Sequence, residues 1–105
     1  MYINNGIFIF DKQRKRIISN QRNIIIVNPT IIMLPKKQLI GTTITMYNET
    51  NSRVSIDSNS KTDLIYSHLY APNGKHQVLI EPNRKIVLTY IINHNKLGKW
   101  YLDIY

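Results

Sequence analysis

Short runs of alternating apolar and polar residues follow one another along residues 34–105. In residues 43–47, for example, Ile44 and Met46 fall on one side of an extended chain, and two threonines and Tyr47 fall on the other. The same period of two recurs in residues 53–57, 85–92 and 99–105. This period is typical of β-strands that bury one face. The buried faces predict a core built by Ile44, Met46, Val54, Ile56, Ile86, Leu88, Trp100 and Leu102.

The first third of the chain, residues 1–33, has a less regular pattern. Its apolar runs predict short strands at residues 7–10, 16–19, 23–27 and 30–34. Turns are indicated at Asn28-Pro29, residues 48–52, Pro72-Asn73-Gly74 and residues 81–84. The turns in the second half are short, so we expect neighbouring strands to pair antiparallel. No segment has the length and period of a stable helix.

Many short strands at roughly ten-residue spacing predict an all-β protein, folded as a single antiparallel β-sandwich or jelly-roll-like domain. With 105 residues the chain has the length of one domain, comprising less regular strands in residues 1–33 and a regular sandwich core in residues 34–105. Cysteine is absent, which excludes disulfides, thiolate zinc sites and thiol nucleophiles. The first residues lack the pattern of a secretion signal, and no apolar run is long enough to span a membrane.

The titratable residues do not form a recognisable catalytic pattern. The carboxylates fall in or beside expected turns, where local hydrogen bonding is their usual role; they are Asp11, Glu49, Asp57, Asp63, Glu81 and Asp103. His68, His76 and His94 lie on separate segments and lack the spacing of metal ligands. A nucleophile elbow and a glycine-rich phosphate loop are both missing from the sequence. We therefore expect a protein that is not an enzyme and has no cofactor.

The chain is strongly basic, with 14 Lys and Arg against six Asp and Glu and a net charge of +8. This balance suggests an anionic partner such as nucleic acid, but frequent Ile, Asn and Lys together also fit the codon bias of an AT-rich genome. The densest basic cluster predicts a contact site made of Lys12, Arg14, Lys15, Arg16 and the nearby Arg22. Because few aromatic residues interleave with this cluster, a protein contact or a solvated loop is favoured over nucleic acid.

Tyrosines are the other candidate contact residues. In the last strand, Tyr101 and Tyr105 alternate with Trp100, so we expect the tryptophan in the core and these tyrosines outside. Asn48-Glu49-Thr50 has the form of a glycosylation sequon, which we interpret as a chance match in an Asn-rich chain.

Several segments of residues 34–105 together resemble a recurring viral module. They are Leu34-Pro35, residues 41–48, Val54-Ser55-Ile56, residues 78–83, Val87-Leu88 and residues 98–102. The pattern is similar to the small β-sandwich domains of phage tail-fibre, receptor-binding and virion-surface proteins. It departs from them at Pro82-Asn83, where such modules carry Pro-Gly. The resemblance implies a structural role, no catalytic residues and frequent assembly as a trimer.

We therefore predict a non-enzymatic viral structural protein, namely a minor capsid, decoration or tail-associated component. It is expected in the virion, after assembly in the host cytoplasm, and its partners would be capsid or tail proteins of the same particle or further copies of itself. The alternative is a nucleic-acid-binding OB-like β-barrel that uses the basic cluster. A third option is a carbohydrate-binding module that uses exposed tyrosines.

Overall fold

A computed structural model describes residues 7–10, 15–18, 22–36, 38–92 and 98–105, and for residues 7–10 and 15–17 it describes the backbone only. All secondary-structure elements in these residues are β-strands, which confirms the prediction of an all-β protein. The strands are β1 Ile7–Phe10, β2 Lys15–Ile17, β3 Asn23–Ile26, β4 Ile31–Met33, β5 Thr43–Asn48, β6 Val54–Asp57, β7 Leu64–Ser67, β8 Ala71–Lys75, β9 Gln77–Ile80, β10 Lys85–Ile92 and β11 Gly98–Ile104.

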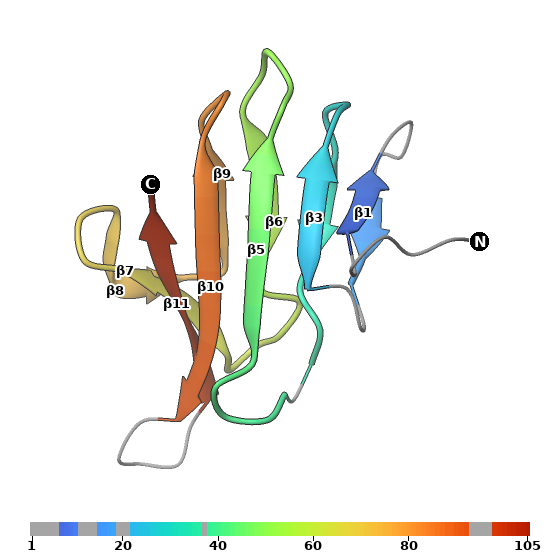
Figure 1. The fold of residues 1–105 in the computed structure, drawn as a ribbon. Coiled ribbons are helices and arrows are strands. Elements are labelled where there is room, and N and C mark those ends of the chain that lie inside the picture. The colour runs from blue at the N-terminus through green and yellow to red at the C-terminus, as the bar shows by residue number, and fades with distance from the viewer. Residues whose placement is uncertain (1–6, 11–14, 19–21, 37, 93–97) are drawn as a thin grey trace.

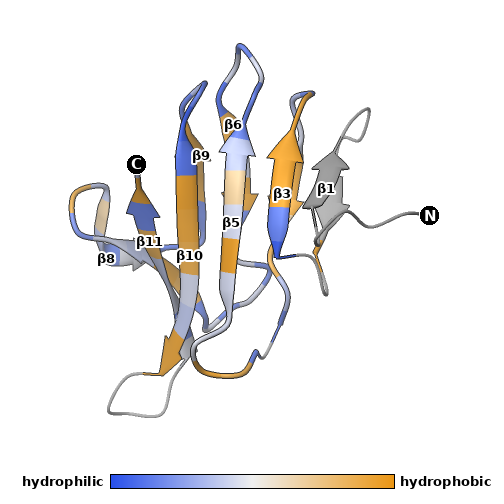
Figure 2. Cartoon of the chain, in the orientation of Figure 1, coloured by the Kyte–Doolittle hydropathy of each residue, from blue (hydrophilic) through white to orange (hydrophobic). Residues whose placement is uncertain are grey.

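The strands form two sheets that lie one behind the other (Figure 1). The large sheet has the order β1-β3-β5-β10-β11-β7-β8, and the small sheet has the order β2-β4-β6-β9. Figure 2 shows hydrophobic residues along the middle of β10 and hydrophilic connections above β5 and β10. These hydrophilic connections meet water, while the inner faces of the strands meet the opposite sheet.

The first six strands alternate between the two sheets. The chain passes from a strand of one sheet to a strand of the other sheet and then returns to the first sheet. The strand that it adds there runs in the same direction as the earlier strand of that sheet. As a result β1, β3 and β5 pair parallel in the large sheet, where Ile7 faces Asn23 and Asn23 faces Thr45. In the same way β2, β4 and β6 pair parallel in the small sheet, where Lys15 faces Ile31 and Ile31 faces Ser55.

The predicted antiparallel pairing is therefore wrong for β1–β6. Among consecutive strands of the second half, it is confirmed for β7–β8 and β10–β11. It is wrong for β9 and β10, which the turn at residues 81–84 joins across the two sheets. Strands β5 and β10, and β6 and β9, also pair antiparallel although they are not consecutive, whereas β11 and β7 pair parallel. The polar residues 48–52, expected to close a hairpin, instead link β5 of the large sheet to β6 of the small sheet. Short polar connections look alike in sequence whether they join paired strands or opposite sheets.

The side chain of Asn48 explains why residues 48–52 form an arch. It is 1% exposed, and its amide nitrogen donates to the carbonyl oxygens of Ser52 (2.8 Å), Ile80 (3.0 Å) and Glu81 (3.2 Å). Its amide oxygen accepts from the backbone N–H and the hydroxyl of Thr50, at 2.9 and 2.6 Å. The amide thus pairs the buried N–H of Thr50 and ties the arch to the carbonyl oxygens at the end of β9. A buried side chain is not available for glycosylation, which agrees with the interpretation of Asn48-Glu49-Thr50 as a chance match.

Pro72-Asn73-Gly74 does not form the predicted turn but lies within β8. This strand is at the edge of the large sheet, where a proline need not donate a ladder hydrogen bond. Gly74 has a φ of +84°, and a Cβ there would lie 2.7 Å from the ring of Tyr66. The true turn comes earlier, at residues 68–70, and the pairing of β7 with β8 shifts register between Ile65 and Ser67.

A continuous cluster of buried apolar side chains fills the space between the sheets. All eight predicted core residues belong to it, and Leu102, the most exposed of them, is 3% exposed. The less regular first third contributes to the same cluster through Ile18, Ile24, Ile26 and Ile32. Burial of one such side chain stabilises the fold by about 1.5–3 kcal/mol. The described parts of residues 1–33 and of residues 34–105 therefore share one core.

Candidate functional site

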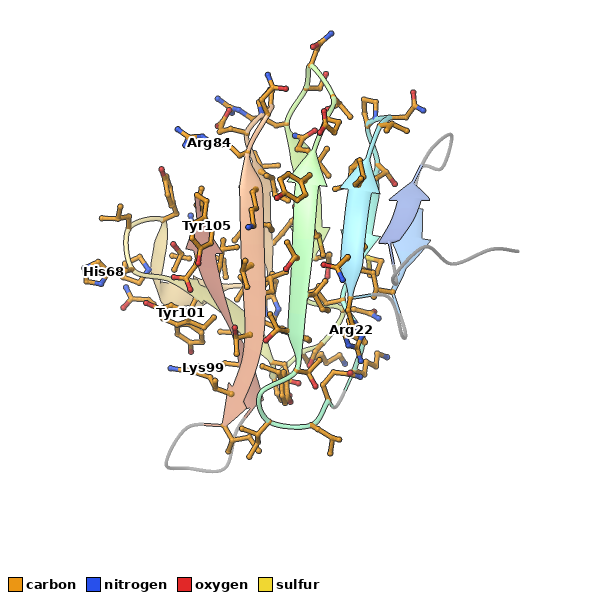
Figure 3. The ribbon with its side chains drawn as sticks, in the orientation of Figure 1. Arg22, His68, Arg84, Lys99, Tyr101 and Tyr105 are labelled. Carbon is orange, nitrogen blue, oxygen red and sulfur yellow. The ribbon has the colours of Figure 1, made fainter. Side chains whose placement is uncertain are left out.

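The outward face of the large sheet carries tyrosines and lysines at adjoining positions. Strand alternation and register place Tyr47 of β5 beside Lys85 of β10, and Tyr101 of β11 beside Tyr66 of β7. Tyr105 follows β11 with the same alternation as Tyr101, and Lys99 precedes it on that strand. We call this set the tyrosine–lysine face: Tyr47, Tyr66, Lys85, Lys99, Tyr101 and Tyr105. Figure 3 looks onto this side of the sheet and labels Lys99, Tyr101 and Tyr105 along β11.

The lysines of the face lie over tyrosine rings. The Lys85 ammonium is 5.7 Å from the ring centroid of Tyr47 and 5.3 Å from that of Tyr105. The Lys99 ammonium is 4.6 Å from the ring centroid of Tyr66. Each such cation–π contact at an exposed site contributes about 0.5–1 kcal/mol. The contacts restrict the rings, so the face presents aromatic area in a defined arrangement.

The face remains accessible although its side chains contact one another. Tyr105 is 63% exposed, Tyr47 41% and Tyr101 36%. Trp100, whose side chain alternates with theirs, is fully buried. The expectation that Trp100 packs inside and Tyr101 and Tyr105 point outward is therefore confirmed.

A buried hydrogen bond supports the sheet beneath this face. The Tyr90 hydroxyl donates to a carboxylate oxygen of Asp63 at 2.7 Å, and its ring meets Trp100 edge to face at a centroid distance of 5.0 Å. Desolvation by burial, together with the hydrogen bond to Asp63 and its charge, raises the pKa of Tyr90 to about 12. Gly98 leaves room for this arrangement, because a Cβ at that position would overlap the Tyr90 hydroxyl.

The residues proposed from sequence as the contact site lie elsewhere in the fold. Lys12 and Arg14 are outside the described residues. Lys15 and Arg16 belong to β2, at an edge of the small sheet, where the structure describes their backbone. Arg22 precedes β3, and its guanidinium donates to the side-chain oxygen of Gln38 at 3.2 Å. The structure therefore does not test the basic cluster as a site, and it stays a prediction.

The alternation of the last strand indicated Tyr101 and Tyr105, but their lysine neighbours were missed. Lys85 and Lys99 are isolated from each other in the sequence, whereas clustered basic residues such as those of residues 12–16 stand out. The signal was nevertheless present, because strand alternation puts Lys99 on the same side as Tyr101 and Tyr105. Two other tyrosines took different roles: Tyr90 is buried, and Tyr70 lines a pocket beside β9.

In the described part of the chain, no three His, Asp or Glu side chains gather as a metal site would require. His76 places its Nδ1 atom 3.1 Å from the carbonyl oxygen of Ser60, His68 is exposed, and His94 is outside the described residues. Within the same residues, no helix has the length and apolar character needed to cross a membrane.

The chain matches no protein-family model and has no significant similarity to a curated protein. Its function is therefore inferred from its own geometry and from the sequence pattern.

Proposed function

We propose that this chain is a non-enzymatic structural protein of a viral particle that works by docking. Its partner is a larger capsid or tail protein of the same particle, or further copies of the chain. The observation that carries the proposal is the accessible tyrosine–lysine face on the large sheet. The viral setting comes from the sequence pattern of residues 34–105.

Tyrosine is enriched at protein interfaces, because it supplies a large contact area and a polar tip while losing little rotamer freedom. In the tyrosine–lysine face the rings are already restrained by lysines, so ordering them on binding costs less. The face also lies on β5, β10, β11 and β7, four adjacent strands of one sheet. These features favour a rigid docking surface.

The proposal includes a finer description of the fold as a β-sandwich. The two sheets share one apolar core and expose their opposite faces, which supports this description. In the sandwich, the outward side of the large sheet is the docking side, and homo-oligomerisation through it would bury the exposed tyrosines.

The test replaces the tyrosines and follows assembly. A Tyr101→Ser/Tyr105→Ser variant should lose incorporation into viral particles, detected by antibody in purified particles, or lose its oligomeric state, measured by size-exclusion chromatography with light scattering. A Leu39→Ser/Ile40→Ser variant is the control, because it removes two exposed apolar side chains from another place, 84% and 66% exposed. Absence of the unaltered chain from particles, combined with a monomeric state, would contradict the proposal.

Deletion of residues 1–33 is not a suitable test of the basic cluster. Removing residues 1–33 would also remove Ile24, Ile26 and Ile32 from the core, so loss of assembly would report unfolding. Reversing the charges of Lys12, Arg14, Lys15 and Arg16 avoids this loss. If the charge-reversed chain assembles at normal occupancy, the cluster is not the docking contact.

Binding of single-stranded nucleic acid is the second candidate function. Neighbouring Tyr66 and Tyr101 with Lys99 beside them resemble the mixture of stacking rings and cations that such proteins use. The two separate sheets differ from the five-stranded barrel of an OB-like fold, so the sheet face rather than a barrel groove would bind.

Fluorescence anisotropy with a labelled oligothymidine, measured over a series of salt concentrations, tests this alternative. Binding should weaken steeply with salt, and Lys85→Gln/Lys99→Gln should flatten the slope by about one for each lost phosphate contact. Lys61→Gln, at an exposed position in the 58–62 connection, is the control. Absent or salt-insensitive binding would remove the nucleic-acid function.

A further inference from the structure

The small sheet has fewer strands than the large sheet. It ends at β9, which lies behind β10, whereas the large sheet continues through β11, β7 and β8 (Figure 1). Leu102 and Ile104, on the inner side of β11, border a pocket of about 410 Å3 beside β9.

The pocket has an apolar floor and an open strand edge. Leu102 and Ile104 of β11 and Val78 and Ile80 of β9 line it, together with Tyr70 from the turn before β8. Its volume is within the range of ligand-binding pockets. The 51% exposure of Leu79 and the 62% exposure of Tyr70 show that apolar surface at its margin is still accessible.

The backbone of β9 can accept another strand. Ser58 N–H donates to the carbonyl oxygen of His76 at 2.7 Å, and the register continues with Asp57 opposite Gln77. Hydrogen-bonded pairs alternate along an antiparallel ladder, so the backbone groups of Gln77 and Leu79 point away from β6. These groups lie along the outer edge of β9, which pairs with no described strand on that side.

The charges at the rim of the pocket favour an acidic group. Lys75, Glu81 and Arg84 all line it. The Glu81 carboxylate is 3.1 Å from the Arg53 guanidinium, which offsets its charge, and Arg84 donates to the carbonyl oxygen of Tyr105 at 3.1 Å while keeping further N–H donors. The rim is therefore positive, in keeping with the overall charge of +8.

We propose that β9 binds an extended segment of a partner protein as an added strand, with alternating apolar residues over the pocket floor and a carboxylate near Lys75 and Arg84. Strand addition of this kind uses main-chain hydrogen bonds for affinity and side-chain pockets for selectivity. A single strand suits the site better than the sheet of a second copy, because β8 and Tyr70 flank the edge. This surface is separate from the tyrosine–lysine face and goes beyond the function proposed above.

The probe is a synthetic eight-residue peptide with an amidated C-terminus that alternates Val and Thr and ends in Asp. Added to the nitrogen-15-labelled full chain, it should produce its largest amide shifts at Gln77 and Leu79. The same peptide ending in Lys should bind about two- to fivefold more weakly, the range expected for an exposed ion pair. Methylation of alternate peptide nitrogens should abolish binding, because it removes the donors that face β9.

Leu79→Pro is the decisive variant of the chain. It removes an outward N–H while leaving the ladder to β6 intact, so the fold should persist and peptide binding should be lost. Leu79→Thr keeps this N–H and should retain binding. If the proline variant fails to fold, the methylated peptide provides the same test. No shift at millimolar peptide, or binding that survives backbone methylation, would overturn the proposal.

Discussion

Strands β1–β6 and strands β7–β11 build their parts of the molecule by different routes. In the first region the chain changes sheet at each connection and adds strands in parallel, whereas in the second region β7–β8 and β10–β11 pair as antiparallel neighbours. Apart from Tyr47, the tyrosine–lysine face comes from the second region, as do the floor and rim of the β9 pocket. One shared core thus supports a region of strands stacked in parallel beside a region that carries most of the tyrosine–lysine face and the β9 pocket.

The largest change in the free energy of unfolding is predicted for the removal of one core side chain from each region, β1–β6 and β7–β11. Ile32 of β4 and Leu88 of β10 are both fully buried in one cluster, so Ile32→Ala and Leu88→Ala should each lower the free energy of unfolding by about 2–5 kcal/mol. Urea unfolding followed by circular dichroism and by the fluorescence of Trp100 should give coincident transitions. Two separate transitions would show that the regions unfold independently.

A somewhat smaller effect is expected at the side chain that ties the regions together. Asn48→Ala removes the bonds from the β5–β6 arch to the carbonyl oxygens of Ile80 and Glu81, and leaves buried groups unpaired. It should lower the free energy of unfolding by about 2–3 kcal/mol, measured by urea unfolding. Asn51→Ala, at an exposed position of the same arch, should change it by less than about 0.5 kcal/mol. Equal effects of the two changes would contradict the role given to Asn48.

The buried hydroxyl of Tyr90 predicts a pH dependence that belongs to the second region. Its pKa is raised from 10.0 to about 12 in the folded protein, so the unfolded chain loses this proton first. The contribution of the protonated form is complete below pH 10 and is lost as the pH rises from 10 to about 12, by about 2 kcal/mol. Urea unfolding across this interval should show a steeper fall for the unaltered chain than for Tyr90→Phe. Parallel curves would show that Tyr90 does not cause the fall.

The smallest predicted effect is at the surface. Lys85→Met keeps the aliphatic stem but removes the charge between Tyr47 and Tyr105, and should lower the free energy of unfolding by about 0.5–1 kcal/mol. Thermal unfolding at low and high salt measures this change, with Lys61→Met as the control. A destabilisation no greater than that of the control would mean that Lys85 does not restrain the rings.

Much of the local structure could be predicted from the sequence. Alternation identified the strands of residues 43–105 well, and it assigned Trp100 to the core and Tyr101 to the surface. These properties depend on neighbouring residues in one strand, which the sequence displays directly. The exception was Pro72-Asn73-Gly74, because an edge strand tolerates residues that usually form turns.

The choice of strand partners could not be predicted in the same way. Residues 48–52 are as short and polar as a hairpin loop, and their sequence does not show that the Asn48 side chain is buried and bonded to the end of β9 in an arch between the sheets. The pairing of Lys85 with Tyr47, and of Tyr101 with Tyr66, depends on register across strands that are distant in sequence. The tyrosine–lysine face therefore became recognisable as a site once the sheet order was known.

The alternating path of β1–β6 has a consequence for how such a protein can change in size. Each return to the large sheet adds one strand to both layers and repeats the same packing, as the parallel pairs of β1 with β3 and of β2 with β4 show. A gene duplication of the unit between Ile7 and Asn23 would thus insert one more strand into each sheet and extend the core without redesigning it. Strands β5, β10 and β11 would keep their neighbours, so the length of the protein could evolve separately from its contact surface.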